Sequence, residues 1–170
     1  MTACPWVWVV ACAFIFSGRL RAQSPDGEPA AVIEVGGAAE RSFSEGHPGF
    51  GPTIAIEVTP IENWLELETG VTALFRPQST EWSVDLLFKK PWTFSGRAEL
   101  MLGIGPAWVH TKSNGFHMNA IAAELVPDFM YWPFNTHRLG LYVAPSYSYK
   151  FGPTPEHAIG ITGGLLIGIL

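Results

Sequence analysis

The sequence predicts an all-β chain: an eight-stranded antiparallel up-and-down transmembrane β-barrel. Three observations predict it. Of 170 residues, 48% are hydrophobic and only 15% are charged, with a mean hydropathy of +0.20, whereas an average globular chain is about 25% charged. No internal stretch approaches the ~20 consecutive apolar residues that a membrane-spanning helix needs. Apolar residues instead recur at every second position in eight stretches, which is the pattern of β-strands.

The composition also excludes two classes of protein. Apolar and aromatic residues are too abundant for an intrinsically disordered chain. Lys and Arg total 10 against 15 Asp and Glu, a net charge of −5, and no basic cluster is present. A nucleic-acid-binding protein would carry the opposite charge balance, so no nucleic-acid partner is expected.

The first segment predicts export of the chain. Residues 6–16 (WVWVVACAFIF) form a compact apolar run that is followed by a few small and polar residues, which is typical of a secretory signal peptide. We predict a signal peptide over 1–22 and a polar leader over 23–30, before a barrel over 31–170. A short membrane anchor is the alternative, although the run is too short to span a bilayer. Cleavage would remove both cysteines and with them any thiol or disulfide chemistry.

The first four predicted strands each place apolar residues on one face and small or charged residues on the other. The second of them, for example, sets Ile54, Ile56 and Val58 against Ala55 and Glu57. Turn residues separate the four stretches, which cover 31–40, 53–59, 64–75 and 81–89.

The second half of the chain repeats this arrangement over 97–110, 120–132, 138–151 and 159–170. Three of these stretches contain a proline, at Pro106, Pro127 and Pro145. A proline within a strand removes one hydrogen-bond donor from the ladder, a loss that a β-bulge could absorb.

The composition of the two faces decides which one points outward. The non-apolar face consists mostly of Gly, Ala, Ser and Thr with one or two charges per strand. Such a face suits the narrow interior of an eight-stranded barrel better than a surface in water. A closed barrel also pairs every backbone polar group, as a lipid environment requires. The alternative is a soluble lipocalin-like ligand-binding barrel, with the apolar face inside.

Aromatic residues support the membrane orientation. Eight of them gather near the predicted strand ends, where interfacial girdles belong: Trp82, Trp92, Phe94, Trp108, Tyr131, Phe134, Tyr147 and Tyr149. An even strand number places both chain ends on one side, the periplasm for a bacterial barrel. Short outer loops are then predicted over 41–52, 76–80, 111–119 and 152–157.

The apolar first segment, the cysteine-free remainder and the eight alternating strands resemble the small outer-membrane β-barrel proteins, the OmpA/OmpX-like and OmpW-like group. The resemblance covers nearly the whole chain after the first segment and rests on pattern. It implies a monomeric, porin-like barrel in the bacterial outer membrane. Its implied partners are outer-membrane lipid, lipopolysaccharide and the outer-membrane assembly machinery.

The charged residues of the inward face predict what fills the lumen. They are Glu34, Glu57, Glu66, Glu68, Asp85, Lys89, Arg97, Glu99, Glu124, Asp128 and Arg138. Counting across hairpins puts Glu66 opposite Lys89, with Arg97 beside them. Buried ions are tolerated only when they are paired, so we predict a plug of salt bridges and a structural or small-solute-related role. The alternative is a cation path or a proton-binding carboxyl cluster, because acids outnumber cations. General porin activity is not expected from eight strands.

Catalysis and metal binding are the remaining possibilities. A lipid-modifying, acyl hydrolase-like barrel would need a hydroxyl, a histidine and a carboxylate together, and the candidates near the outer rim are Ser79, His110, Ser113, His117, Glu156 and His157. No local motif singles them out, so no enzymatic activity and no catalytic residue is predicted. The histidines lack the spacing of metal ligands, so neither a metal site nor a cofactor is expected.

Overall fold

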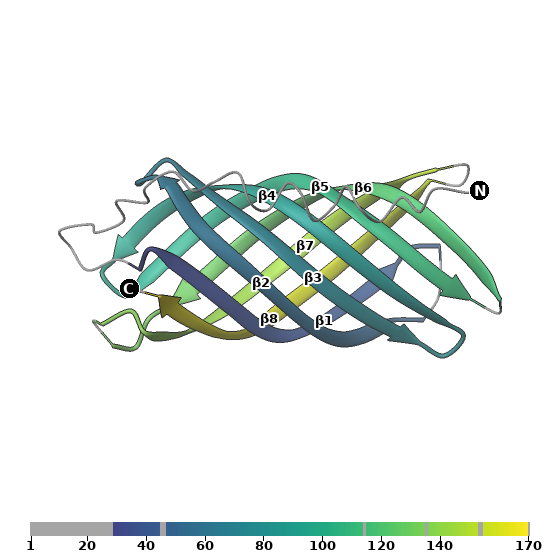
Figure 1. Cartoon of the computed structure of the whole chain (residues 1–170), viewed down its shortest axis with the longest axis horizontal. Coiled ribbons are helices and arrows are strands. Elements are labelled where there is room, and N and C mark those ends of the chain that lie inside the picture. The colour runs from purple at the N-terminus through teal and green to yellow at the C-terminus, as the bar shows by residue number, and fades with distance from the viewer. Residues whose placement is uncertain (1–28, 45–46, 114, 135, 153–154, 170) are drawn as a thin grey trace, which may run out of the picture.

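The computed structural model describes residues 29–44, 47–113, 115–134, 136–152 and 155–169. They form a closed antiparallel barrel in which each strand pairs with its sequence neighbours and β8 pairs with β1 (Figure 1). The strands are β1 (Ala31–Ser42), β2 (Gly49–Ile61), β3 (Leu65–Arg76), β4 (Ser79–Ser95), β5 (Ala98–Ser113), β6 (Phe116–Tyr131), β7 (Leu139–Phe151) and β8 (Glu156–Ile169). The predicted all-β, eight-stranded fold is confirmed. The predicted signal peptide and most of the leader lie outside the described residues.

No helix among the described residues has the length and apolar character needed to cross a membrane.

The strands are longer than the apolar alternation predicted. β2 begins at Gly49 rather than at residue 53, and β4 runs to Ser95. The backbone ladder continues past the last apolar residue, as in the pair between Thr80 and Lys112. Much of the predicted outer loops is therefore strand, and the β3–β4 and β5–β6 connections reduce to 77–78 and 114–115.

The strand registers show how strongly the barrel is staggered. A path of paired residues that leaves β1 at Ala31 returns to β1 at Arg41, ten positions farther along the strand, by way of Val58, Leu67, Phe88, Ile104, Leu125, Tyr147 and Ile159. Such a stagger goes with strands that tilt steeply against the barrel axis. Residues far apart in sequence consequently share one level of the lumen.

The three prolines of the predicted strands are accommodated without bulges. Pro106 pairs with Ala123, Pro127 with Leu102 and Pro145 with Ile161 in unbroken registers. The β4–β5 ladder passes from Asp85–Ala107 to Phe88–Ile104 without a shift. A proline there costs a hydrogen bond without inserting a residue, and the register does not shift at any of the three prolines. The registers shift instead near strand ends, between residues 58 and 61 and between 93 and 95.

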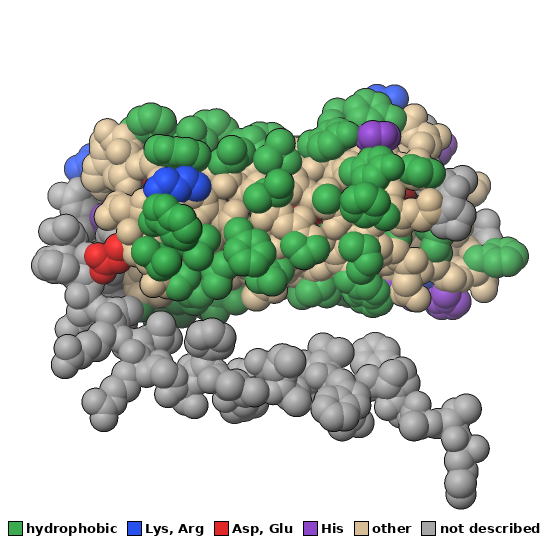
Figure 2. All heavy atoms as spheres, turned by 90° about the horizontal axis from the view of Figure 1, so that it is seen from above, with side chains coloured by type: hydrophobic (Ala, Val, Ile, Leu, Met, Phe, Trp, Pro, Cys, Tyr) green, Lys and Arg blue, Asp and Glu red, His purple; other side chains and the backbone are tan. Residues whose placement is uncertain are grey.

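Large apolar side chains point outward on all eight strands. Figure 2 shows them spread over one face of the barrel, and examples from four strands are Ile54, Leu86, Ile104 and Ile161, each 42–61% exposed. The lumen holds buried charges and small residues, together with a cluster of buried apolar side chains that includes Leu87, Met101 and Leu166. The soluble lipocalin-like alternative, which needs a polar exterior, is therefore wrong.

Exposed aromatic residues mark both ends of the barrel. The end that holds Ala31 and Ile169, here called the terminal end, carries Trp64, Trp92, Phe94, Tyr131 and Phe134. The opposite end, here called the far end, carries Phe43, Phe50, Phe75, Trp82, Trp108, Phe116, Tyr147 and Phe151. Two such groups, separated by aliphatic side chains, have the arrangement of interfacial girdles.

Candidate functional site in the barrel lumen

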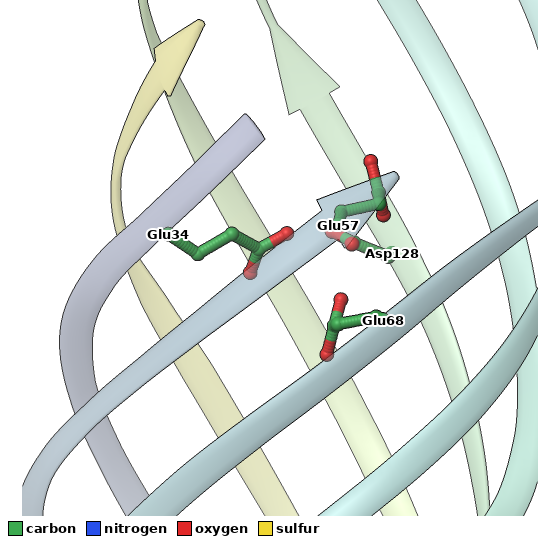
Figure 3. Close-up of side chains that lie close together, drawn as sticks. All are labelled: Glu34, Glu57, Glu68 and Asp128. Atoms are coloured by element: carbon green, nitrogen blue, oxygen red, sulfur yellow. The ribbon is translucent and has the colours of Figure 1, made fainter. Parts of the chain in front are cut away.

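The lumen is crossed by an ionic cluster around Lys89 on β4, here called the central cluster. Lys89 is 1% exposed. Its Nζ lies 2.9 Å from Glu57 Oε2, 2.6 Å from Asp128 Oδ2 and 3.7 Å from Glu34 Oε1, and it also pairs with Glu68. The carboxylates come from β1, β2, β3 and β6, and one oxygen of each lies within 4.8 Å of the others (Figure 3). One ammonium group thus links five of the eight strands.

Register and a glycine position the Lys89 side chain. Glu57 and Glu68 stand directly opposite each other on β2 and β3, an arrangement of like charges that is unfavourable unless a cation lies between them. To reach Asp128 on β6, the lysine must pass β5, where Gly103 is its partner. A Cβ at Gly103 would lie 3.1 Å from Lys89 Cγ. The missing side chain at this position gives the lysine room to cross the lumen.

A second ionic group, here called the far-end cluster, holds two cations. Arg76 Nη2 lies 2.8 Å from Glu40 Oε1, and Arg76 Nη1 lies 3.3 Å from Glu81 Oε2. Lys150 Nζ donates hydrogen bonds of 2.9 Å to both carboxylate oxygens of Glu81 and lies 3.6 Å from Glu40. Glu156 is 4.0 Å from Lys150 and completes the cluster. Charges of both signs are nearly balanced here, unlike in the central cluster.

Two small cavities lie on either side of the central cluster. The one toward the far end has a volume of about 80 Å³, and its wall includes Asp85 and Glu124. Asp85 Oδ1 accepts a 2.9 Å hydrogen bond from the Gly70 backbone N–H. The cavity toward the terminal end is also about 80 Å³, and its wall includes Glu66 and Glu99. Both have space for water molecules, and the central cluster separates them.

The structure brings most of the predicted lumen charges into the barrel. Glu34, Glu57, Glu68, Lys89 and Asp128 form the central cluster, whereas Glu66, Asp85, Glu99 and Glu124 line the two cavities.

Arg97 and Arg138 are not part of the central cluster. Glu66 pairs with Lys89 as the register count predicted, but Arg97 does not stand beside them. Both arginines are exposed and precede β5 and β7, because those strands begin one residue later than predicted.

Sequence reasoning did not assign the far-end cluster. Arg76 fell in a predicted loop, and Glu40, Glu81 and Lys150 were not among the predicted site residues. The inward parity of β3 gave a usable signal, because Arg76 continues the series of Glu66, Glu68, Gly70, Thr72 and Leu74 on the inward face.

The residues considered for catalysis are not assembled into a reactive set. Ser113 Oγ donates a hydrogen bond to the backbone carbonyl of Gln78 (3.1 Å), and Glu156 faces Lys150. The hydroxyl of Tyr147 lies 2.5 Å from His157 Nδ1. Within the described part of the chain, neither Ser79 nor Ser113 hydrogen-bonds to a histidine. The pairing of hydroxyl and imidazole that a nucleophilic serine needs is therefore missing there.

Comparison with known proteins identifies the fold. Neisserial surface protein A superposes with a TM-score of 0.66 at 13% identity over 82% of this chain and 96% of that one. The N-terminal β-barrel domain of Pseudomonas aeruginosa OprF gives a TM-score of 0.52 at 14% identity over 82% and 98% of the two chains. The chain has the fold of the small outer-membrane β-barrels.

A third barrel of this kind, the attachment invasion locus protein Ail of Yersinia pestis, gives a TM-score of 0.51 at 11% identity, covering 82% of this chain and 99% of Ail. No family model and no curated protein matches the sequence. Sequence identities this low show the fold alone, so the properties of this barrel have to be argued from its own residues.

Proposed function

We propose that this chain is a bacterial outer-membrane barrel whose lumen is closed by paired ions and that has a structural or small-solute-related role. The observation that carries the proposal is the central cluster, in which the Lys89 ammonium meets carboxylates from four other strands. Its partners on this proposal are outer-membrane lipid and lipopolysaccharide around the barrel, and the assembly machinery that inserts it. The barrel is proposed to act as a monomer.

The outer surface supports the membrane location. Large apolar side chains are exposed on all eight strands. Soluble proteins rarely expose contiguous apolar patches above a few hundred Å², so this surface suits lipid better than water. The aromatic groups at the two ends suit the interfaces of a bilayer, and the strands of 12–17 residues exceed the ~9–11 residues that a tilted transmembrane strand requires.

The lumen supports closure rather than general solute passage. Lys89, Glu57 and Asp128 are each 1–3% exposed, so the cluster fills the cross-section at its level. Removing one partner from a buried ion pair typically costs 3–5 kcal/mol, because the other partner keeps its charge without compensation. The cluster therefore acts as a cross-link between strands as well as a barrier.

The experiment that tests closure is a conductance measurement on planar bilayers containing the barrel. The wild-type protein should show no stable open current, and Lys89→Met should leak because the linking ammonium is gone. Arg138→Met, which changes an exposed cation outside the lumen, is the matched control and should behave as wild type. A steady porin-sized current through the wild-type barrel would contradict the proposal.

The excess of carboxylates supports a second candidate function, a cation path. Nine of the predicted lumen residues lie inside, and eight of these are acidic. Any current through the Lys89→Met variant should therefore favour K⁺ over Cl⁻, as its reversal potential in a KCl gradient would show. A current selective for Cl⁻ would exclude this candidate.

A further inference from the structure

We propose that His110 and His117 form a binding site for a divalent late first-row transition metal ion (Zn²⁺, Ni²⁺ or Cu²⁺) on the outer face of the β5–β6 hairpin. The site lies at the far end, outside the lumen, and the proposal goes beyond the function argued from the central cluster. It also departs from the expectation that the scattered histidines form no metal site.

The hairpin register brings the two imidazoles together. His110 on β5 pairs with Asn119, and Lys112 pairs with His117, so the two histidines are diagonal neighbours. His117 Nδ1 and His110 Nε2 share a 3.4 Å hydrogen bond, and the rings stack with centroids 5.5 Å apart. A metal ion bound between the two nitrogens would take the place of that proton. On its other side His110 stacks on Trp108, with ring centroids 5.8 Å apart. The indole and the partner imidazole together restrict how the His110 ring can turn.

Asn119 determines which His110 nitrogen carries the proton. His110 Nδ1 lies 2.8 Å from Asn119 Oδ1, and an amide oxygen only accepts hydrogen bonds, so Nδ1 carries the proton. The lone pair of Nε2 is then directed away from Asn119, on the side where His117 lies. Histidines that bind metals almost always donate their other N–H to such a partner, which fixes the ring and raises its basicity.

The separation of the two nitrogens suits a metal ion. With metal–nitrogen bonds of about 2.0–2.1 Å, two ligands of a tetrahedral ion lie roughly 3.4 Å apart. Imidazole nitrogen suits Zn²⁺, Ni²⁺ and Cu²⁺, whereas Ca²⁺ and Mg²⁺ prefer oxygen ligands. His117 and Asn119 are exposed, so water can complete the coordination. Lys112, exposed beside His117, weakens the site by repulsion between like charges.

The four carboxylates of the central cluster are a less suitable metal site than the two histidines. They converge within 4.8 Å, but the Lys89 ammonium already occupies the position between them. At the far end, by contrast, a hydrogen bond joins the two imidazoles, and its proton can be replaced by a metal ion.

The test is calorimetric titration of the detergent-extracted barrel with Zn²⁺, and titration with Cu²⁺ followed by tryptophan fluorescence, since Trp108 adjoins His110. We expect one ion per chain, with quenching that is reduced in Trp108→Phe and largely lost when Trp82, which is paired with His110 on β4, is replaced by Phe as well. His117→Ala should abolish binding of both ions. Asn119→Ala should weaken binding by about 10–100-fold, the usual effect of removing a group that orients a ligand, and Lys112→Gln should strengthen it.

His157→Ala is the matched control, because it removes a histidine at the same end that faces Tyr147; it should bind as wild type. Wild-type levels of binding in His117→Ala, or no binding by the wild-type protein, would overturn the proposal, as would equal binding of Ca²⁺. A heat-modifiability gel, in which a folded barrel migrates differently from the boiled sample, confirms that each variant is folded. These positions are at the surface, where substitutions usually change stability by less than about 0.5 kcal/mol.

Discussion

The two ionic clusters of the lumen neutralise buried carboxylates in different ways. The central cluster surrounds one ammonium with four carboxylates, whereas the far-end cluster places Arg76 and Lys150 among Glu40, Glu81 and Glu156. In the first, every carboxylate depends on Lys89. In the second, Glu40 and Glu81 each contact both cations, so either cation can be lost without leaving them unpaired. We therefore expect the stability of such a cluster to depend less on the number of its ion pairs than on how many of its carboxylates rely on a single cation.

The largest expected effect is that of Lys89→Met. The substitution leaves four carboxylates converging in the lumen without a cation, and we expect a loss of about 3–5 kcal/mol in the free energy of unfolding. Urea titration of the detergent-extracted barrel, followed on a heat-modifiability gel, measures it. An unchanged urea midpoint would show that the central cluster does not stabilise the barrel.

Lys150→Met should have a smaller effect, because Arg76 still contacts Glu40 and Glu81. We expect about 1.5–3 kcal/mol, the usual contribution of a single hydrogen bond to a charged group, because Arg76 still offsets the charge of Glu81. The same urea titration measures it. If Lys150→Met lowered the free energy of unfolding as much as Lys89→Met, the second cation of the far-end cluster would not protect its carboxylates.

Asp128→Asn should have the smallest effect of the three. It removes one negative charge from the central cluster and leaves Lys89 with Glu34, Glu57 and Glu68, so we expect about 0.5–1.5 kcal/mol. If the urea midpoint fell as far as for Lys89→Met, the ammonium would depend on Asp128 alone and the cluster would be a simple pair.

The alternation of side chains made most of the fold predictable. A period of two places Glu34, Glu57 and Lys89 on the inward face whatever the register, because a strand alternates strictly. It also places large apolar residues such as Ile54 on the lipid side. Strand ends were less predictable, because the ladder at both ends continues through polar residues that carry no apolar signal.

Which charges meet was harder to predict, because it depends on the register of every strand around the closed barrel. Asp128 reaches Lys89 across β5 only because Gly103 leaves room there. The far-end cluster and the pairing of His110 with His117 were missed for a related reason. Residues 111–119 and Arg76 were assigned to loops. Because a loop has no strand partner, its neighbours across the barrel could not be predicted.

The two-residue connections at the far end should limit where a protease can cut the barrel. Proteases cut preferentially at exposed loop tips, where several residues can be drawn into an active site. The β3–β4 and β5–β6 connections, at 77–78 and 114–115, are too short to offer such a stretch without unpairing the strands beside them. If the far end faces the outside of the cell, as the proposed orientation has it, the barrel should therefore resist proteases added to intact cells at these two connections.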